Sequence, residues 1–251
     1  MQTVRTGAAI GLIAQLALLA ALAGTVGLGG TGLAVGIACG VTTNAALSRG
    51  LAGSGADVVG PADRVTLVRA TLAGGVAALT ADSFDRPAPV TTLVALTVVA
   101  LALDAVDGWV ARRTHTASTF GARFDMEVDA FLILVLSVYV ARSTGGWVLA
   151  IGAARYAFVA AGWLLRWMRG STPPRYWCKV VAATQGVVLT VAVADVLPPI
   201  VTEAALAISL ALLTESFGRD VGWLWRHREV GPYRIRLDPG PRATLGTDPA
   251  G

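Results

Sequence analysis

The sequence predicts an all-α fold, a polytopic membrane helix bundle of about eight spans, and three observations support this prediction. Of the 251 residues, 55% are hydrophobic and only 14% are charged, whereas soluble domains carry about 25% charged residues. Apolar stretches near the roughly 20 residues that a bilayer requires recur along the chain. Lysine and arginine gather in alternate connections, as expected of a multi-pass protein.

The first two spans lie in a segment without charged residues, 6–48. It is too long for one span and divides at the glycine-rich stretch 27–32, which favours a tight turn. A secretory signal peptide is the alternative, since Arg5 precedes the apolar stretch, but no polar mature domain follows. Residues 1–60 are therefore expected to form an N-terminal transmembrane hairpin and a polar loop.

Six further spans are expected after this loop, each bounded by glycine, proline or charged residues. They are placed at about 62–81, 87–113, 121–141, 146–168, 177–196 and 200–217, the last with an extension toward Trp225. These spans form one predicted membrane domain, 61–228. The remaining segment, 229–251, is rich in proline, glycine and arginine and is expected to be a disordered cytoplasmic tail.

The cations also predict the orientation in the cell membrane. They are concentrated in one set of loops and helix ends, whereas the opposite loops hold only Arg86 and Arg142. This asymmetry predicts cytoplasmic termini and a cytoplasmic loop between the fourth and fifth spans. Because the cations adjoin apolar spans, the formal net charge of +4 indicates topology and phosphorylated ligands, and no nucleic acid partner is expected.

Four aspartates lie at the ends of the fourth and fifth spans: Asp104, Asp107, Asp125 and Asp129. The members of each pair are three or four residues apart and so share one helical face. The short connection predicts that the two helices are antiparallel neighbours, with both pairs facing each other near the cytoplasmic boundary. One or two divalent cations would remove the repulsion between the carboxylates, and oxygen ligands favour Mg²⁺ or Mn²⁺.

This segment resembles the signature of the CDP-alcohol phosphotransferase family, D-x2-D-G-x2-A-R-x8-G-x3-D-x3-D. The fixed positions are met by Asp104, Asp107, Gly108, Ala111, Arg112, Gly121, Asp125 and Asp129. The resemblance covers about residues 62–226 and implies a six-helix family core preceded by an added two-helix hairpin. In pattern the chain is nearest to phosphatidylglycerophosphate and phosphatidylinositol phosphate synthases.

The resemblance implies that two divalent ions hold the pyrophosphate of a CDP-diacylglycerol donor. Their ligands would be Asp104, Asp107 and Asp125, with Asp129 in the same metal set and also acting as the general base. The nucleotide pocket would be lined by Gly108, Ala111, Arg112 and Gly121.

Thr66 and Arg69 keep the spacing of the family's P-N-x2-T-x2-R pattern, in which Asp63 replaces the asparagine with an offset of one residue. The resemblance therefore assigns Thr66 and Arg69 to the nucleotide as well. Capping of the third span by Asp63 is the alternative interpretation of this segment.

The implied reaction is transfer of a phosphatidyl group to a small polar alcohol with release of CMP, a step of phospholipid biosynthesis. We expect Arg155, Arg175 and Lys179 to bind a phosphate on the acceptor, which indicates glycerol 3-phosphate or inositol 1-phosphate, and we favour glycerol 3-phosphate. Arg155 lies mid-span, where an arginine is costly unless it faces a polar cavity, but cations at helix ends also snorkel to the interface.

Two departures leave other interpretations open. Val181 and Ala182 stand where a second lysine and a threonine are usual after Lys179. A non-catalytic membrane scaffold of the same family is therefore an alternative, as is a transporter, although a transporter would spread its acids over several spans. The resemblance alone implies a homodimer.

Overall fold

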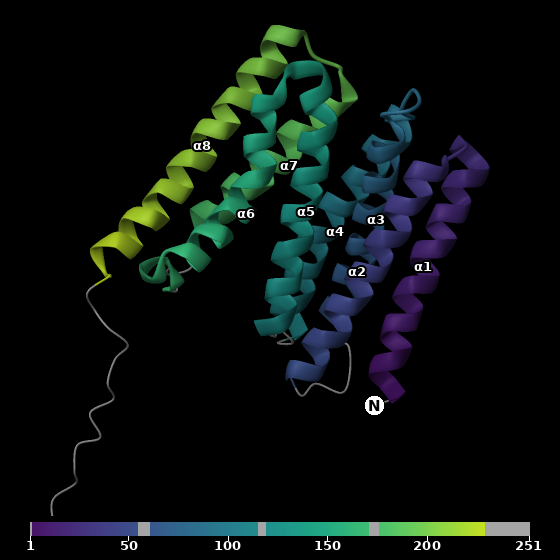
Figure 1. Cartoon of the computed structure of the whole chain (residues 1–251), viewed down its shortest axis with the longest axis horizontal. Helices are drawn as coiled ribbons and strands as arrows, with labels where there is room; N and C mark the ends of the chain where they lie inside the picture. The colour runs from purple at the N-terminus through teal and green to yellow at the C-terminus, as the bar shows by residue number, and fades with distance from the viewer. Residues whose placement is uncertain (1, 55–60, 115–118, 171–175, 229–251) are drawn as a thin grey trace, which may run out of the picture.

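Eight α-helices and two short 3₁₀ turns make up the described part of the chain, seen here as a computed structural model (Figure 1). The structure describes residues 2–54, 61–114, 119–170 and 176–228, without the side chains of 2–9, 51–54, 61–63, 107–114, 119–120, 166, 169 and 176. The helices are α1 (Gln2–Val26), α2 (Gly30–Ser54), α3 (Pro61–Asp82), α4 (Val90–Thr114), α5 (Thr119–Thr144), α6 (Leu149–Leu164), α7 (Tyr176–Ala194) and α8 (Pro199–Arg226). These ranges contain no strand, which confirms the all-α class. The predicted tail, 229–251, lies outside them.

Among the described residues, five segments are long and apolar enough to cross a membrane by length and composition. They are Gly30–Gly50, Arg64–Asp82, Gly146–Leu164, Trp177–Ala194 and Pro199–Arg226. Shorter apolar segments lie in α1 (Ile10–Val26) and α4 (Val90–Val106). The chain is thus a polytopic membrane helix bundle, and the predicted total of eight spans stays a prediction.

The fourth helix begins three residues later than the sequence indicated, at Val90 instead of Pro87. Proline disfavours helical backbone in the residue before it, so Pro89 keeps Ala88 out of the helix. The carbonyl of Pro89 then accepts the first helical hydrogen bond, from the amide of Leu93 at 3.0 Å.

The predicted sixth span, 146–168, is interrupted at both ends. A 3₁₀ turn, η1 (Gly146–Val148), precedes α6, and a second one, η2 (Arg166–Arg169), follows it. Between α6 and η2, Leu165 has an extended backbone (φ −108°, ψ 103°), which ends the helix. The regular part of this span is therefore shorter than predicted.

Helix α3 is the centre of the bundle, because it packs against α1, α2, α4 and α5. Inside the protein, 72% of its apolar segment is buried, the largest share among the five candidate spans. Small side chains such as Ala73, Ala77 and Ala78 allow this close packing. The sequence predicted that α4 and α5 are neighbours. Within the described residues, α4 and α5 each pack more against α3 than against each other.

The tip of the N-terminal hairpin, which α1 and α2 form, is hydrogen-bonded to the C-terminal end of α3. The backbone amide of Gly29 donates to Asp82 Oδ1 at 3.0 Å, and Asp82 also pairs with Arg86 at 2.8 Å. A Cβ atom on Gly29 would lie 2.2 Å from Arg86 Nη2 and 2.6 Å from Asp82 Oδ1, so a larger residue would require both side chains to move. The turn that precedes it uses Gly27 with a φ of +71°.

Helices α5 and α6 lie close together at Gly152, where an added Cβ would lie 2.5 Å from Leu134 Cα. We expect Gly152→Ala to destabilise the protein by about 1–3 kcal/mol, because the backbones must separate. Thermal unfolding in detergent measures this effect. Gly218→Ala on α8, where a Cβ meets nothing within 4 Å, is the matched control; equal unfolding temperatures for the two variants would contradict the proposed close contact.

Candidate active site

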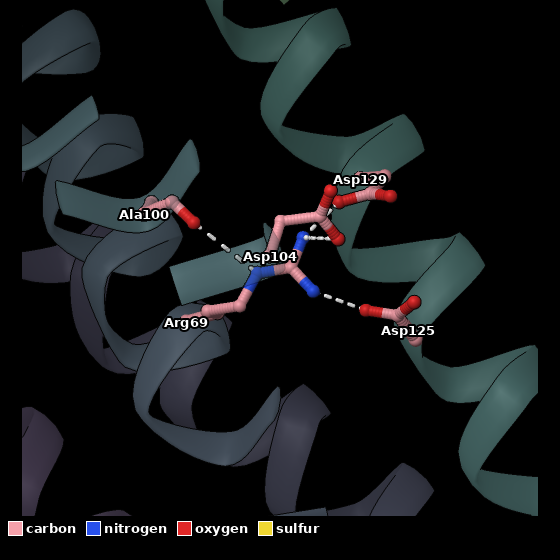
Figure 2. Close-up of polar contacts among 5 residues, drawn as sticks. All are labelled: Arg69, Ala100, Asp104, Asp125 and Asp129. Carbon is pink, nitrogen blue, oxygen red and sulfur yellow. Dashed lines mark hydrogen bonds and ion pairs between the residues drawn. The ribbon is translucent and has the colours of Figure 1, made fainter. Parts of the chain in front are cut away.

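Three of the four predicted aspartates meet in space. Asp104 comes from α4, and Asp125 and Asp129 come from successive turns of one face of α5 (Figure 2). One carboxylate oxygen from each lies within 4.8 Å of the others. The side chains are 42%, 34% and 32% exposed, so the group can be reached from outside the bundle.

The guanidinium of Arg69, from α3, lies among these carboxylates (Figure 2). Its Nη2 is 3.0 Å from Asp104 Oδ1 and also pairs with Asp129, while Nη1 pairs with Asp125. Its Nε donates to the backbone carbonyl of Ala100 at 3.3 Å. The side chain is only 1% exposed, so these contacts hold it in one place from inside the bundle.

The charges of these four side chains do not balance, because one guanidinium stands against three carboxylates. A buried arginine in a membrane bundle requires anionic partners, and Arg69 has them. Carboxylate oxygen atoms that converge in this way are ligands that Mg²⁺ or Mn²⁺ prefers. The donor set therefore fits a divalent cation.

The other residues of the aspartate motif are only partly described. The backbone of α4 extends over Asp107, Gly108, Ala111 and Arg112, but their side chains lie outside the described part of the structure. On α5, Gly121 lies one turn before Asp125.

Thr66 and Arg69, which the resemblance assigned to the nucleotide, lie one turn apart on α3, and Thr66 is 4% exposed. The contact of Arg69 with three aspartates was not foreseen, and its nucleotide role stays a prediction. The spacing within α4 and α5 predicts which acids share a face, but it carries no information about a third helix. The available signal was Arg69 itself, a cation within an apolar span.

Arg155, assigned to the acceptor, pairs with Glu127: its Nη2 lies 2.5 Å from Glu127 Oε1. Glu127 lies on another face of α5 than Asp125 and Asp129, and it contacts Arg155 of α6 instead of joining the metal set. This pair was not predicted from the sequence, although a mid-span arginine on the next helix was a usable signal.

The remaining acceptor residues are not joined to Arg155. Lys179 is exposed in the first turn of α7, and no hydrogen bond or ion pair links it to another described residue. Arg175 lies outside the described residues. Gln185, on the same helix as Lys179, is 1% exposed and donates to the Ser209 carbonyl at 2.9 Å, so it joins α7 to α8.

We expect Arg69→Gln to make the stability of the protein depend on divalent cations. Without Arg69 the carboxylates repel one another, so the metal-free variant should lose about 3 kcal/mol or more. Mg²⁺ should then raise its unfolding temperature more than that of the wild type, as measured by thermal unfolding with Mg²⁺ or with a chelator. Arg219→Gln, which removes an exposed cation paired with Glu215 on α8, is the control. An Arg69 variant with the Mg²⁺ response of the control would contradict this electrostatic account.

Comparison with known protein families gives one match. The model of the CDP-alcohol phosphatidyltransferase family matches residues 60–214, a range that includes Arg69, the aspartate motif and the start of α8. Searches of curated proteins and of solved structures found no match. The family's enzymes generally depend on divalent metals, in agreement with the carboxylate group described above. Since the match covers more than half of the chain, the protein belongs to the CDP-alcohol phosphatidyltransferase family, whose members are membrane enzymes of phospholipid synthesis.

Proposed function

We propose that the protein transfers a phosphatidyl group from CDP-diacylglycerol to glycerol 3-phosphate at the cytoplasmic face of the membrane, with release of CMP. The observation that carries this proposal is the convergence of Asp104, Asp125 and Asp129 around Arg69 at one end of the bundle. A site at a membrane boundary suits a donor with acyl chains and a water-soluble headgroup. Inositol 1-phosphate is the alternative acceptor.

The proposed chemistry is a displacement at the phosphorus of the phosphatidyl group. The acceptor hydroxyl oxygen forms a bond to this phosphorus, the bond from the phosphorus to the bridging oxygen of CMP breaks, and CMP leaves with that oxygen. Asp129 takes the proton of the hydroxyl, which is otherwise a poor nucleophile at neutral pH. Arg69 supports this role because it holds Asp125 and Asp129 in fixed positions.

The metal set in this proposal consists of Asp104, Asp107, Asp125 and Asp129, with two Mg²⁺ or Mn²⁺ ions. When bound, such ions neutralise the pyrophosphate and the departing CMP. The nucleotide would lie against Gly108, Ala111, Arg112 and Gly121, where small residues let a ligand approach the backbone.

Arg155, Arg175 and Lys179 would bind the phosphate of the acceptor. The ion pair between Arg155 and Glu127 bears on this assignment, because an acceptor phosphate would compete with the Glu127 carboxylate for the guanidinium. A guanidinium forms bidentate bonds with a phosphate, which makes that exchange favourable. The expected homodimer is not needed for this arrangement and stays a prediction.

Asp129→Asn should lower the rate of CMP release at least about 100-fold, because the amide cannot accept the proton of the acceptor hydroxyl. Release of CMP from CDP-diacylglycerol by the purified protein measures this rate, and thermal unfolding checks that the variant is folded. Glu203→Gln, at an exposed position of α8, is the matched control. Wild-type turnover by folded Asp129→Asn would refute the base assignment, and a membrane scaffold would not require Asp129 at all.

A screen of acceptor alcohols tests the substrate assignment. We expect CMP release with glycerol 3-phosphate and a divalent ion, and none when a chelator is added, because the carboxylates need a cation to hold the pyrophosphate. Failure with both glycerol 3-phosphate and inositol 1-phosphate, together with turnover of serine or free inositol, would discard the phosphate pocket formed by Arg155, Arg175 and Lys179.

A further inference from the structure

A cavity of about 550 Å³ opens at the end of the bundle opposite the aspartates. Its walls come from the α3–α4 connection and from the last turns of α5 and α7, at the upper end in Figure 1. Arg142 lines this cavity at the end of α5, whereas Asp125 and Asp129 lie near the start of the same helix. At 1.5 Å per residue the two regions are roughly 20 Å apart along the helix, so the cavity is separate from the proposed active site.

The side chain of Arg142 is oriented by uncharged groups. Its Nη1 donates to Ser83 Oγ at 2.5 Å, and its guanidinium carbon lies 4.6 Å from the centre of the Phe84 ring. Within the described residues, no carboxylate forms an ion pair with it, and its hydrogen bond to Ser83 uses one of five N–H donors. Arg142 therefore offers the cavity a positive charge in a fixed position.

The other charged residues of the lining divide into two groups. Arg86 is neutralised by Asp82, which it contacts at 2.8 Å and 3.1 Å. Asp85 accepts a hydrogen bond from the Thr31 hydroxyl at 2.7 Å, and Asp195 is exposed at the end of α7. Within the described part of the chain, neither Asp85 nor Asp195 forms an ion pair with a cation.

Among the residues that the structure describes, the cavity thus combines one guanidinium without a carboxylate partner and two carboxylates without a cationic partner. Arg142, Asp85 and Asp195 all line this cavity, so charges of both signs face the same space. The lining also has an apolar part, which includes Phe84, Val90 and Val193. A purely anionic ligand would be repelled by the carboxylates, and a purely cationic one by Arg142.

We propose that this cavity binds the headgroup of a zwitterionic phospholipid that carries a primary ammonium beside its phosphodiester. Arg142 binds the phosphate, since a guanidinium presents several N–H donors to phosphate oxygens. Asp195 and Asp85 bind the ammonium, whose three N–H donors match carboxylate acceptors. The apolar wall receives the glycerol end of the lipid at the membrane boundary. This lipid site contains none of the residues assigned to the proposed reaction, and binding there would be a function in addition to that reaction.

Native mass spectrometry of the full-length protein in detergent tests the proposal with phosphatidylethanolamine, phosphatidylglycerol and phosphatidylcholine. Phosphatidylethanolamine should bind about tenfold more tightly than the other two, because only it supplies both a phosphate and a hydrogen-bonding ammonium. Arg142→Gln and Asp195→Asn should each weaken its binding about tenfold. Arg219→Gln, outside the cavity, should bind it like the wild type.

Glycerophosphoethanolamine, the same headgroup without acyl chains, distinguishes a lipid from a soluble ligand and should bind at least tenfold more weakly. Equal binding of phosphatidylethanolamine and phosphatidylglycerol, full binding by both variants, or equal binding of the soluble headgroup would overturn the proposal. If Arg142→Gln does not fold, Asp195→Asn and the comparison of lipids still decide. Absence of CMP release would count against the transferase function and would leave these binding results unaffected.

Discussion

The contact between Arg69 and three carboxylates is the interaction on which the arrangement of this protein depends. An arginine that is 1% exposed in a membrane bundle is stable only among anions, and three carboxylates within 4.8 Å of one another are stable only beside cations. Each group therefore fixes the other. To bring them together, α3 must lie between α4 and α5, and its small residues make this central position possible.

The same arrangement separates two kinds of polar site within one apolar bundle. At one end, carboxylates outnumber the guanidinium, which suits a divalent cation and a pyrophosphate. At the other end, charged side chains of both signs line an open cavity. Two of them form hydrogen bonds with uncharged groups, Arg142 with the Ser83 hydroxyl and Asp85 with the Thr31 hydroxyl. Between the ends, the packed apolar side chains of α3, α4 and α5 keep the two environments apart.

The sequence predicted well those features that depend on the residues of a single helix. Two predictions rested on properties of single helices: the hydrophobic lengths of the spans, and the four-residue spacing that puts Asp125 and Asp129 on one face. The structure confirms the all-α class. It also brings Asp104 together with Asp125 and Asp129. The contacts of Arg69 with α4 and α5, and of Arg155 with Glu127, join different helices. Nothing in the spacing of one helix determines which neighbour lies against it, so the spacing did not predict these contacts. An arginine within an apolar span indicates only that an anionic partner lies nearby. The start of α4 was misjudged for a local reason, because a proline also restricts the residue before it.

The place of α3 in the chain has a consequence for biosynthesis. With a mean hydropathy of 1.2, its apolar segment is the least hydrophobic of the five candidate spans, and it carries Arg69 in its first third. Such a segment would enter lipid poorly as an isolated helix. Helices α1 and α2, which pack against α3, are synthesised before it. At the tip of this pair, the backbone amide of Gly29 donates the hydrogen bond that Asp82 accepts. The N-terminal hairpin thus provides a protein surface against which a marginally hydrophobic helix can insert, before the aspartates that pair with its arginine have been translated.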